Sequence, residues 1–363
     1  MTTWTRRSLV GLLPALGHAG SLTKGQELPS DRGKYPDPAT EFEVLRLTSA
    51  KYSSFLPASP ARIISRNSDF YIFASDRTGK LEAFRMDLKN ANWRQLTQCE
   101  SLDADSLVLL PQDRSFAWYD QERLFVSALS GGRERTVYES PSGWRHHPGL
   151  HVADDGMNAF AVEAKDGQYR LRMISLAKGT AVTLAEQSGP IELVGSRPKR
   201  ASFLYRAENA LWLVHHDAKQ NRRLKTVPGK VAAAYWSPEG EAVEYLHIPD
   251  ETNKLNSLRE HTPDSNADVL IGTTSQFVTF IPNIDASVFL GASRSKASPV
   301  VLLYIRYSKR ELTLCEHKSS DPVQTKVRFT PSSQRILFQS DMHGKPAIYF
   351  MDVRKLVELT DEA

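Results

Sequence analysis

The sequence predicts an all-β protein, a seven-bladed β-propeller built from four-stranded antiparallel blades. The first observation is a unit of three short strands joined by two polar turns, which runs from Phe70 to Thr97. The second is that this unit recurs, most clearly from Arg335 to Asp361. The third is the spacing: with the weaker copies counted, about seven units follow one another at a period of roughly 40 to 50 residues, as propeller blades do. One blade cannot bury both of its faces, whereas a ring of blades can.

The first unit shows why each part should be a strand or a turn. Its opening stretch, FYIFAS, is aromatic and apolar, as a buried strand should be. The polar stretch SDRTG follows, and its Gly79 can take the positive φ of a tight reversal. The stretches LEAFRMDL and WRQLT, separated by the turn KNAN, complete an antiparallel meander.

The last unit repeats the same phrases. Its stretch SDMHGKPAIYFMDV matches SDRTGKLEAFRMDL in the SD pair, the turn glycine, the aromatic residue and the MD pair. We interpret Asp76 and Asp341, the acidic residues of these two turns, as turn-forming carboxylates that accept backbone N–H bonds rather than as catalytic acids.

The chain ends predict how the ring closes. The stretch VLRLT, from Val44 to Thr48, looks like the end of a blade whose other strands are missing. We expect this segment to pair with the final blade, because closure of that kind removes an open edge. The propeller domain is therefore predicted to span residues 41–363, after a lead-in arm at residues 21–40.

The segment 1–20 has the three-part pattern of an export signal. Arg6 and Arg7 precede the apolar run from Leu9 to Leu16, and small residues follow. The arginine pair resembles a twin-arginine signal, and a disordered N-terminus is the alternative. The apolar run is too short to span a membrane, and no later stretch is long enough. We expect a soluble protein that is periplasmic or secreted.

Composition restricts the possible partners. The formal net charge is +4, a mild excess that suits an anionic ligand without demanding one. No basic, aromatic-interleaved run indicates nucleic acid, and no phosphate loop, dinucleotide fingerprint or Ser-His-Asp elbow is present.

Cys99 and Cys315 are the only cysteines. They are expected to be free thiols because they lie in distant units, although an oxidising compartment would allow them to pair.

Three stretches resemble one family of enzymes. They are YPDPATEFEVLRLTS near the start, ASDRTGKLEAFRMDLKNANWRQLT in the first unit and RFTPSSQRILFQSDMHGKPAIYFMDV in the last. They look like the opening, first blade and last blade of the oligogalacturonate lyases, which are seven-bladed propeller enzymes of pectin breakdown. Tol-type periplasmic propellers share the blade phrases, so the lead-in with its DP pair is the more specific part.

The resemblance implies β-elimination on an acidic oligosaccharide, with manganese held by histidines and a glutamine at the propeller axis. This sequence departs from that ligand set. The family's glutamine falls on Asp321, two of its histidines fall on Gln324 and Lys326, and a further one falls on Gln276. The histidine of a mid-chain stretch falls near Arg206. No metal ligand is therefore assigned and the cofactor stays open, because these groups are poor manganese ligands without histidines.

Two hypotheses follow for the function. In the first, the protein is a lyase that cleaves pectic (uronic acid) oligosaccharides, and its site is rebuilt around cations. Lys326 and Arg206 are then the candidate catalytic residues, and Gln276, Gln324 and Arg328 are candidate substrate-binding residues, because arginine pairs bidentately with a carboxylate. In the second, the ring is a catalytically inactive Tol-type propeller that binds carbohydrate or protein, since a fold does not fix a function.

The densest histidine cluster is WRHHPGLH, which begins at Trp144. It adds Arg145 and His147 as candidate substrate-binding residues, because a histidine can titrate near neutral pH. The alternative is a loop of solvated histidines, and Pro148 favours that alternative because proline interrupts a strand ladder.

Overall fold

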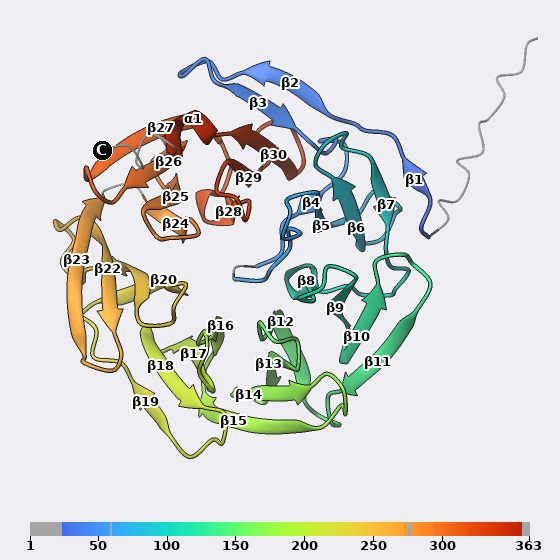
Figure 1. Ribbon diagram of the computed structural model, residues 1–363, viewed down its shortest axis with the longest axis vertical. Coiled ribbons are helices and arrows are strands. Elements are labelled where there is room, and N and C mark those ends of the chain that lie inside the picture. Colours follow the sequence, from blue (N-terminus) through green and yellow to red (C-terminus); the bar gives the residue numbers. More distant parts are fainter. Residues whose placement is uncertain (1–23, 59, 275–276, 358–363) are drawn as a thin grey trace, which may run out of the picture.

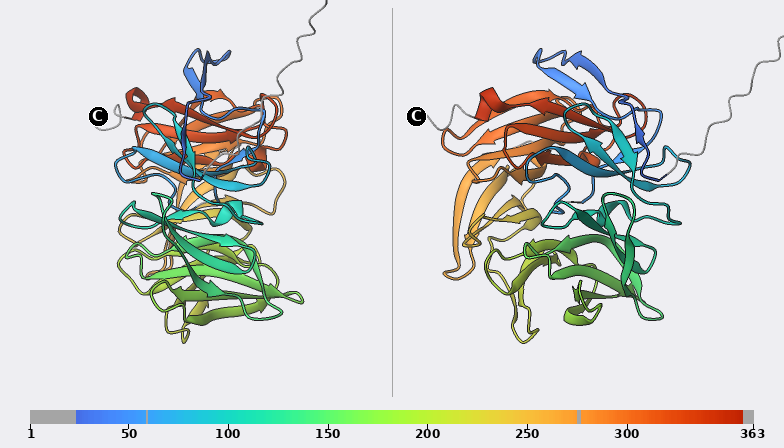
Figure 2. Two further views of the ribbon diagram at one scale, coloured as in Figure 1. Left: turned by 90° about the vertical axis from the view of Figure 1, so that its right-hand side faces the viewer. Right: turned by 45° about the vertical axis from the view of Figure 1, so that its right-hand side comes forward.

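Seven antiparallel sheets surround a central axis in the computed structural model (Figure 1). The model describes residues 24–58, 60–274 and 277–357. Seen from the side, the ring is a flattened body (Figure 2). The seven-bladed propeller predicted from the sequence is thereby confirmed. The predicted export signal lies outside the described residues and stays a prediction. Among the described residues, no helix is long and apolar enough to cross a membrane.

We number the blades 1 to 7 in chain order and give the strands of each blade from the axis outward. Blades 1 and 2 consist of β4 (Ser54–Phe55), β5 (Phe70–Ser75), β6 (Glu82–Asp87), β7 (Trp93–Gln95) and β1 (Glu27–Leu28), and of β8 (Val108–Leu109), β9 (Ser115–Asp120), β10 (Arg123–Ala128) and β11 (Glu134–Glu139). Blades 3 and 4 consist of β12 (Arg145–Val152), β13 (Asn158–Lys165), β14 (Gln168–Ser175) and β15 (Ala181–Ser188), and of β16 (Glu192–Ser196), β17 (Ser202–Ala207), β18 (Ala210–His215) and β19 (Asn221–Arg223).

The remaining blades follow the same order. Blades 5 and 6 consist of β20 (Lys230–Trp236), β21 (Val243–Ile248), β22 (Asn256–Thr262) and β23 (Ala267–Thr274), and of β24 (Phe277–Pro282), β25 (Val288–Ser293), β26 (Val300–Ile305) and β27 (Arg310–Glu316). Blade 7 consists of β28 (Val327–Phe329), β29 (Arg335–Ser340), β30 (Ala347–Asp352), β3 (Glu43–Arg46) and β2 (Gly33–Pro36). The short helices are η1 (Ala104–Ser106), η2 (Pro322–Gln324) and α1 (Arg354–Val357).

The N-terminal segment closes the ring, as the sequence predicts. Leu45 and Arg46 of β3 pair with Phe350 and Tyr349 of β30, so the start of the described chain lies on the last blade. The expectation of four strands per blade is wrong for the two end blades. The predicted lead-in arm contributes β1 to blade 1 and β2 to blade 7, and each of these blades therefore has five strands.

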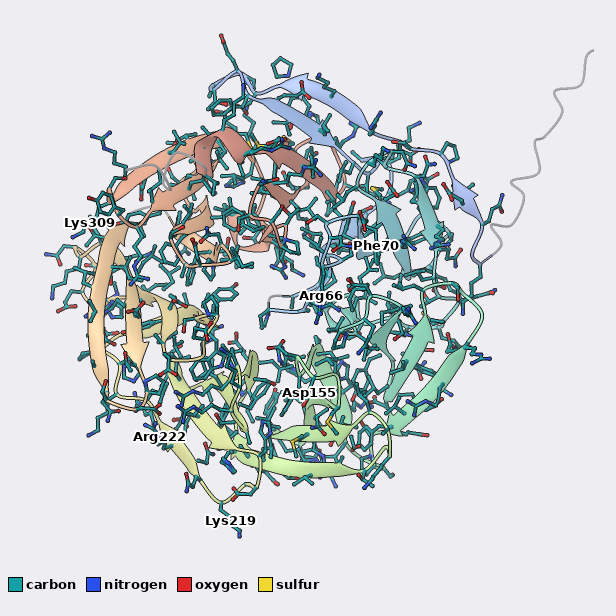
Figure 3. All side chains as sticks on the ribbon, viewed as in Figure 1. Arg66, Phe70, Asp155, Lys219, Arg222 and Lys309 are labelled. Atoms are coloured by element: carbon teal, nitrogen blue, oxygen red, sulfur yellow. The ribbon has the colours of Figure 1, made fainter. Side chains whose placement is uncertain are left out.

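Burial on both faces explains the composition of the inner strands. All six residues of β5 are buried. Side chains of the neighbouring blades 2 and 7 cover the two faces of this blade 1 strand, so little of it meets water. Its aromatic rings continue into the next strand, with Phe73 and Phe84 5.7 Å apart between centroids. Figure 3 shows side chains filling the spaces between blades, with Lys219 and Lys309 at the outer rim.

The two acidic turns have the role that the sequence indicates. A carboxylate oxygen of Asp76 accepts a 2.8 Å hydrogen bond from the N–H of Ser53, and Asp341 accepts one of 2.8 Å from the N–H of Ser320. In blades 1 and 7 the turn between the second and third strands thus fixes the segment that leads to the innermost strand. Gly79 has a φ of 90°, as the tight reversal requires.

The closing strand should be essential for stability. Val44 of β3 is fully buried in the core between blades 6 and 7. We expect Val44→Asp to lower the free energy of unfolding by about 3–5 kcal/mol, because it buries an unpaired charge. Urea unfolding followed by tryptophan fluorescence measures this change. Glu43→Gln, at an exposed position on the same strand, should change it by no more than about 0.5 kcal/mol. Equal stability of the two variants would contradict closure by β3.

Candidate active site

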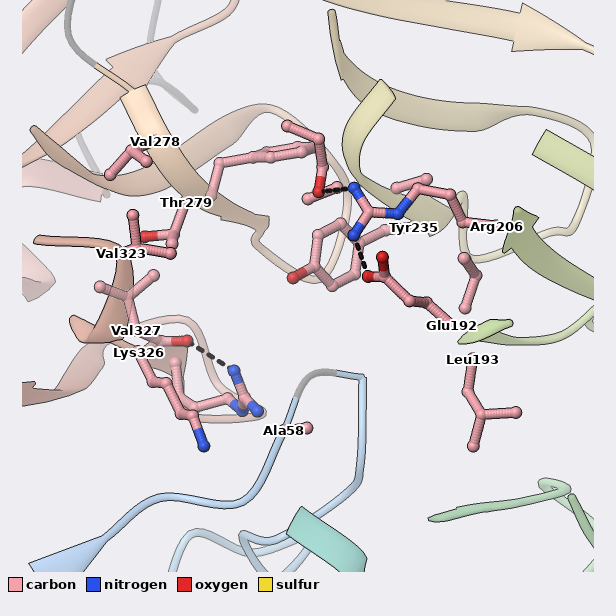
Figure 4. Close-up of a pocket in the computed structure, with 16 residues that line it drawn as sticks. Ala58, Glu192, Leu193, Arg206, Tyr235, Val278, Thr279, Val323, Lys326 and Val327 are labelled. Carbon is pink, nitrogen blue, oxygen red and sulfur yellow. Dashed lines mark hydrogen bonds and ion pairs between the residues drawn. The ribbon is translucent and has the colours of Figure 1, made fainter. Parts of the chain in front are cut away.

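The inner strands of blades 4 to 7 surround a cavity of about 260 Å³ at the axis (Figure 4). We call it the axial cavity. Its volume lies near the small end of the range for ligand pockets, about 300–1,000 Å³, so it suits the end of an oligosaccharide better than a long stretch of one. It is lined by Ala58, Glu192, Leu193, Val194, Arg206, Ala232, Ala233, Ala234, Tyr235, Val278, Thr279, Phe280, Val323, Lys326, Val327 and Arg328.

Arg206 reaches the cavity from β17 of blade 4. Its guanidinium donates a 2.6 Å hydrogen bond to the carbonyl oxygen of Val231 and a second bond to that of Ala232, both on β20. It also forms an ion pair with Glu192, its cross-strand neighbour on β16. The side chain of Arg206 is 17% exposed. The two carbonyl groups therefore fix this cation at the junction of blades 4 and 5.

Lys326 reaches the same cavity from blade 7, just before β28. Its ammonium group donates a 2.9 Å hydrogen bond to the carbonyl oxygen of Leu56, in the segment after β4, and forms an ion pair with Asp105 of η1. These partners belong to blade 1 and to the connection into blade 2. Lys326 thus joins three parts of the ring near the axis.

Arg328, on β28, is the most buried cation of the cavity, with 5% of its surface exposed. Its guanidinium donates hydrogen bonds of 2.9 and 2.7 Å to the carbonyl oxygens of Val327 and Pro57. Burial lowers the pKa of Arg328, and the nearby Tyr235 and Asp105 partly offset that effect. Within the part of the chain that the structure describes, its Nε has no hydrogen-bond partner. Arg328 also lines a second hollow, so it stands between two spaces along the axis.

Tyr235 is a cavity residue that the sequence analysis did not select as a candidate. It lies on β20, and its ring contacts that of Phe280 edge-on at 5.2 Å between centroids. The close-up shows its side chain among the residues that face Arg206 and Lys326 (Figure 4). Ala232, Ala233 and Ala234 precede it on β20 and line the same cavity. The alanines open space that larger residues would fill.

The other predicted site residues lie elsewhere. Gln276 is outside the described residues. Gln324 lies in η2 and lines a separate hollow of about 300 Å³ together with Asp321 and Phe55. Arg145 is exposed and does not line the axial cavity. The structure therefore brings Lys326, Arg206 and Arg328 together and leaves the remaining described candidates apart from them.

The expectation of a solvated loop around the histidine cluster is wrong. The segment forms strand β12, with a register shift between His147 and His151, and Pro148 lies in that irregularity. His147 is half-buried and meets the ring of Tyr169 edge-on at 5.3 Å between centroids. Burial lowers the pKa of His147 and lowers that of His151 to about 4. These histidines are therefore part of the packed interior of blades 3 and 4.

The residues at the axis do not fit a manganese site. Among the described residues, no group of three or more His, Cys, Asp or Glu side chains is placed to hold a metal ion. Lys326 stands where the resemblance places a histidine, and its ammonium group donates hydrogen bonds to the carbonyl oxygen of Leu56 and the carboxylate of Asp105. A cation cannot serve as a metal ligand. We therefore derive no chemical step through manganese.

Comparison with solved structures shows which fold the chain shares with known proteins. No family model matches the chain. A solved oligogalacturonate lyase in complex with manganese has the same propeller architecture, with a TM-score of 0.85 and 20% identity over 91% of this chain and 98% of that chain. The protein thus has the fold of the propeller lyases.

The sequence relatives point to the same family. The oligogalacturonide lyase of Pectobacterium atrosepticum is 22% identical in an alignment of 395 positions, gaps included, that covers 92% of this chain and 98% of the relative. The Tol-Pal system protein TolB of Nitratidesulfovibrio vulgaris is 27% identical over 128 residues, which cover 34% of this chain and 28% of the relative. The resemblance to the oligogalacturonate lyase family is therefore confirmed along nearly the whole chain, and the likeness to TolB is confined to a part.

The strand that pairs with the Tyr235 strand carries a buried carboxyl group that should titrate near neutral pH. Glu244 lies opposite Tyr235 in the pairing of β20 with β21, and is 1% exposed. Burial raises the pKa of Glu244 to about 7 from its ordinary value of 4.5, the carboxylate of Glu260 raises it further, and Arg306 lowers it. A raised pKa in the folded state contributes stability below the unfolded value, and this stability is lost as the pH rises through the folded value.

We therefore expect Glu244 to weaken the fold between pH 5 and pH 8. Over that range the wild-type protein should lose about 3 kcal/mol of unfolding free energy relative to Glu244→Gln, whose amide does not ionise. Urea unfolding of both proteins at the two pH values measures the difference. A pH-independent difference between them would contradict a protonated Glu244 in the folded state.

Proposed function

We propose that the protein binds an acidic oligosaccharide of the oligogalacturonide class in the axial cavity and cleaves it by β-elimination. Two kinds of observation support the proposal. The cavity gathers three cationic side chains, Arg206, Lys326 and Arg328, and such groups recognise carboxylates. The full-length relatives are named oligogalacturonide and oligogalacturonate lyases.

The reaction sets two requirements. A base takes the proton from C5 of the uronate, the C4–O4 bond breaks, and a double bond forms between C4 and C5. The departing electron pair stays on O4, which gains a proton. Proton removal next to the C6 carboxylate develops further negative charge there, so a cation must stabilise that charge, and a base must lie within hydrogen-bond reach of C5.

The lining residues divide between these two tasks. Arg206 and Arg328 would hold the carboxylate and stabilise the developing charge. Lys326 and Tyr235 can exchange protons and line the same cavity. We assign proton abstraction from C5 to Lys326, whose ammonium group must first release a proton to solvent, and protonation of O4 to the hydroxyl of Tyr235. The proton acquired by Lys326 passes to solvent, and the phenolate of Tyr235 regains one from solvent.

The burial of Arg328 is the observation that carries this proposal. In the described residues its guanidinium has only carbonyl partners, and no carboxylate forms an ion pair with it. A desolvated cation with no directly paired carboxylate attracts an anion strongly, because the local dielectric constant is low. Its place in the wall of the axial cavity makes a ligand carboxylate the natural counter-ion.

The activity assay follows the unsaturated product. Incubation with trigalacturonate should generate the ultraviolet absorbance of a double bond conjugated to a carboxylate, and a chelator should not reduce the rate. Methyl-esterified trigalacturonate should react more slowly, because it lacks the free carboxylates. If the protein binds trigalacturonate without forming this product, it is a carbohydrate-binding propeller and the catalytic proposal fails.

Variants of Lys326 test its role in proton transfer. Lys326→Arg keeps the positive charge but cannot act as a base, so it should retain binding while kcat/KM falls by about 100-fold or more. Lys309→Met removes a lysine from the outer rim (Figure 3) and should leave the rate unchanged. Full activity of Lys326→Arg would contradict the assignment.

Loss of the Tyr235 hydroxyl should affect turnover more than binding. Tyr235→Phe keeps the ring that contacts Phe280 and should lower kcat by about 100-fold with little change in KM. Initial rates over a range of trigalacturonate concentrations separate the two constants. Tyr307→Phe, at a tyrosine that is 88% exposed, is the matched control. A change in KM alone would show that Tyr235 only positions the ligand.

A further inference from the structure

Two cations of the axial cavity share one pattern of contacts. Arg206 and Lys326 are each fixed by backbone carbonyl groups, and each also forms an ion pair with a single carboxylate of the protein. The carboxylate beside Arg206 belongs to Glu192, at the start of β16, and that beside Lys326 belongs to Asp105 of η1. The carbonyl groups would keep both cations in place if the carboxylates moved away.

The two carboxylates are more exposed than the cations they contact. The side chain of Glu192 is 57% exposed against 17% for Arg206, and that of Asp105 is 33% exposed against 21% for Lys326. Exposed ion pairs contribute little to stability, because water screens them and two flexible side chains must be ordered. Either carboxylate can therefore leave its cation at small cost when another anion takes its place.

We propose that Glu192 and Asp105 occupy the positions that two ligand carboxylates take when an acidic oligosaccharide binds. The inference rests on the ligand class of the proposed function, and it makes Glu192 and Asp105 specificity-determining residues of that site. The ligand must bring a free carboxylate to each position, since only an anion replaces the charge that leaves. The site should therefore favour a ligand with two free carboxylates over a ligand with one.

The charges explain why exchange, rather than simple addition, is expected. Glu192 and Asp105 already balance Arg206 and Lys326, and a ligand carboxylate added beside an occupied pair would meet repulsion from the protein carboxylate. Displacement avoids this repulsion and leaves the carboxylates of Glu192 and Asp105 in water. The buried Arg328, which has no ion-pair partner among the described residues, then supplies the net attraction for the acidic ligand.

Binding of an inert ligand tests the inference apart from catalysis. The probe is a digalacturonate in which a CH₂ group replaces the glycosidic oxygen, so that no elimination can occur. Isothermal titration calorimetry in the presence of a chelator gives its Kd. Glu192→Gln and Asp105→Asn should each tighten binding by about two- to fivefold, because each removes one competing charge. The dimethyl ester of the probe should show no such gain.

The control and the contrary outcomes separate this inference from the proposed function. Glu239→Gln removes an exposed carboxylate that pairs with Lys199 on the surface, and it should leave the Kd unchanged. Weaker or unchanged binding by both Glu192→Gln and Asp105→Asn, or an equal gain for the ester, would overturn the displacement inference alone. Absence of binding by the wild type and all variants would overturn the proposed ligand class as well.

Discussion

The pairing of β3 with β30 is the constraint on which the rest of the structure depends. It joins the start of the described chain to its last blade and covers the outer edge of β30. Only a closed ring brings Arg206 of blade 4 and Lys326 of blade 7 to the wall of one cavity, although 120 positions separate them in the sequence. The site is therefore a consequence of closure.

Cationic side chains, rather than histidines, stand at the axis of the closed ring. One solved structure with this fold is an oligogalacturonate lyase in complex with manganese. The axis of this chain carries cationic side chains whose partners are carbonyl groups and two carboxylates. A guanidinium or ammonium group supplies positive charge without any metal, and it adds directional hydrogen bonds to a carboxylate. Cationic side chains can therefore take over the role of a metal ion in this chain. They explain how it can keep the fold although it lacks histidines at the positions where the resemblance indicates metal ligands.

The propeller fold and its closure could be predicted from the sequence, because the blade repeats recur at a regular period and the closing strand has a recognisable sequence motif. Lys326, Arg206 and Arg328 were found because they stand where inner strands begin or where the family has ligands. Tyr235 and Glu192 were missed, since their places at the cavity depend on cross-strand register. The β12 segment was misjudged for a similar reason: a bulge accommodates its proline, and the sequence does not show bulges.

We propose that cations of the protein, rather than a metal ion, receive the carboxylate of an acidic sugar at the axis. Its most direct test is a crystal structure of the protein with the CH₂-linked digalacturonate, grown in the presence of manganese. We expect a ligand carboxylate within hydrogen-bond distance of Arg206 and Arg328, with no metal ion in contact with it. A manganese ion bound to that carboxylate, or a ligand bound outside the axial cavity, would contradict this proposal.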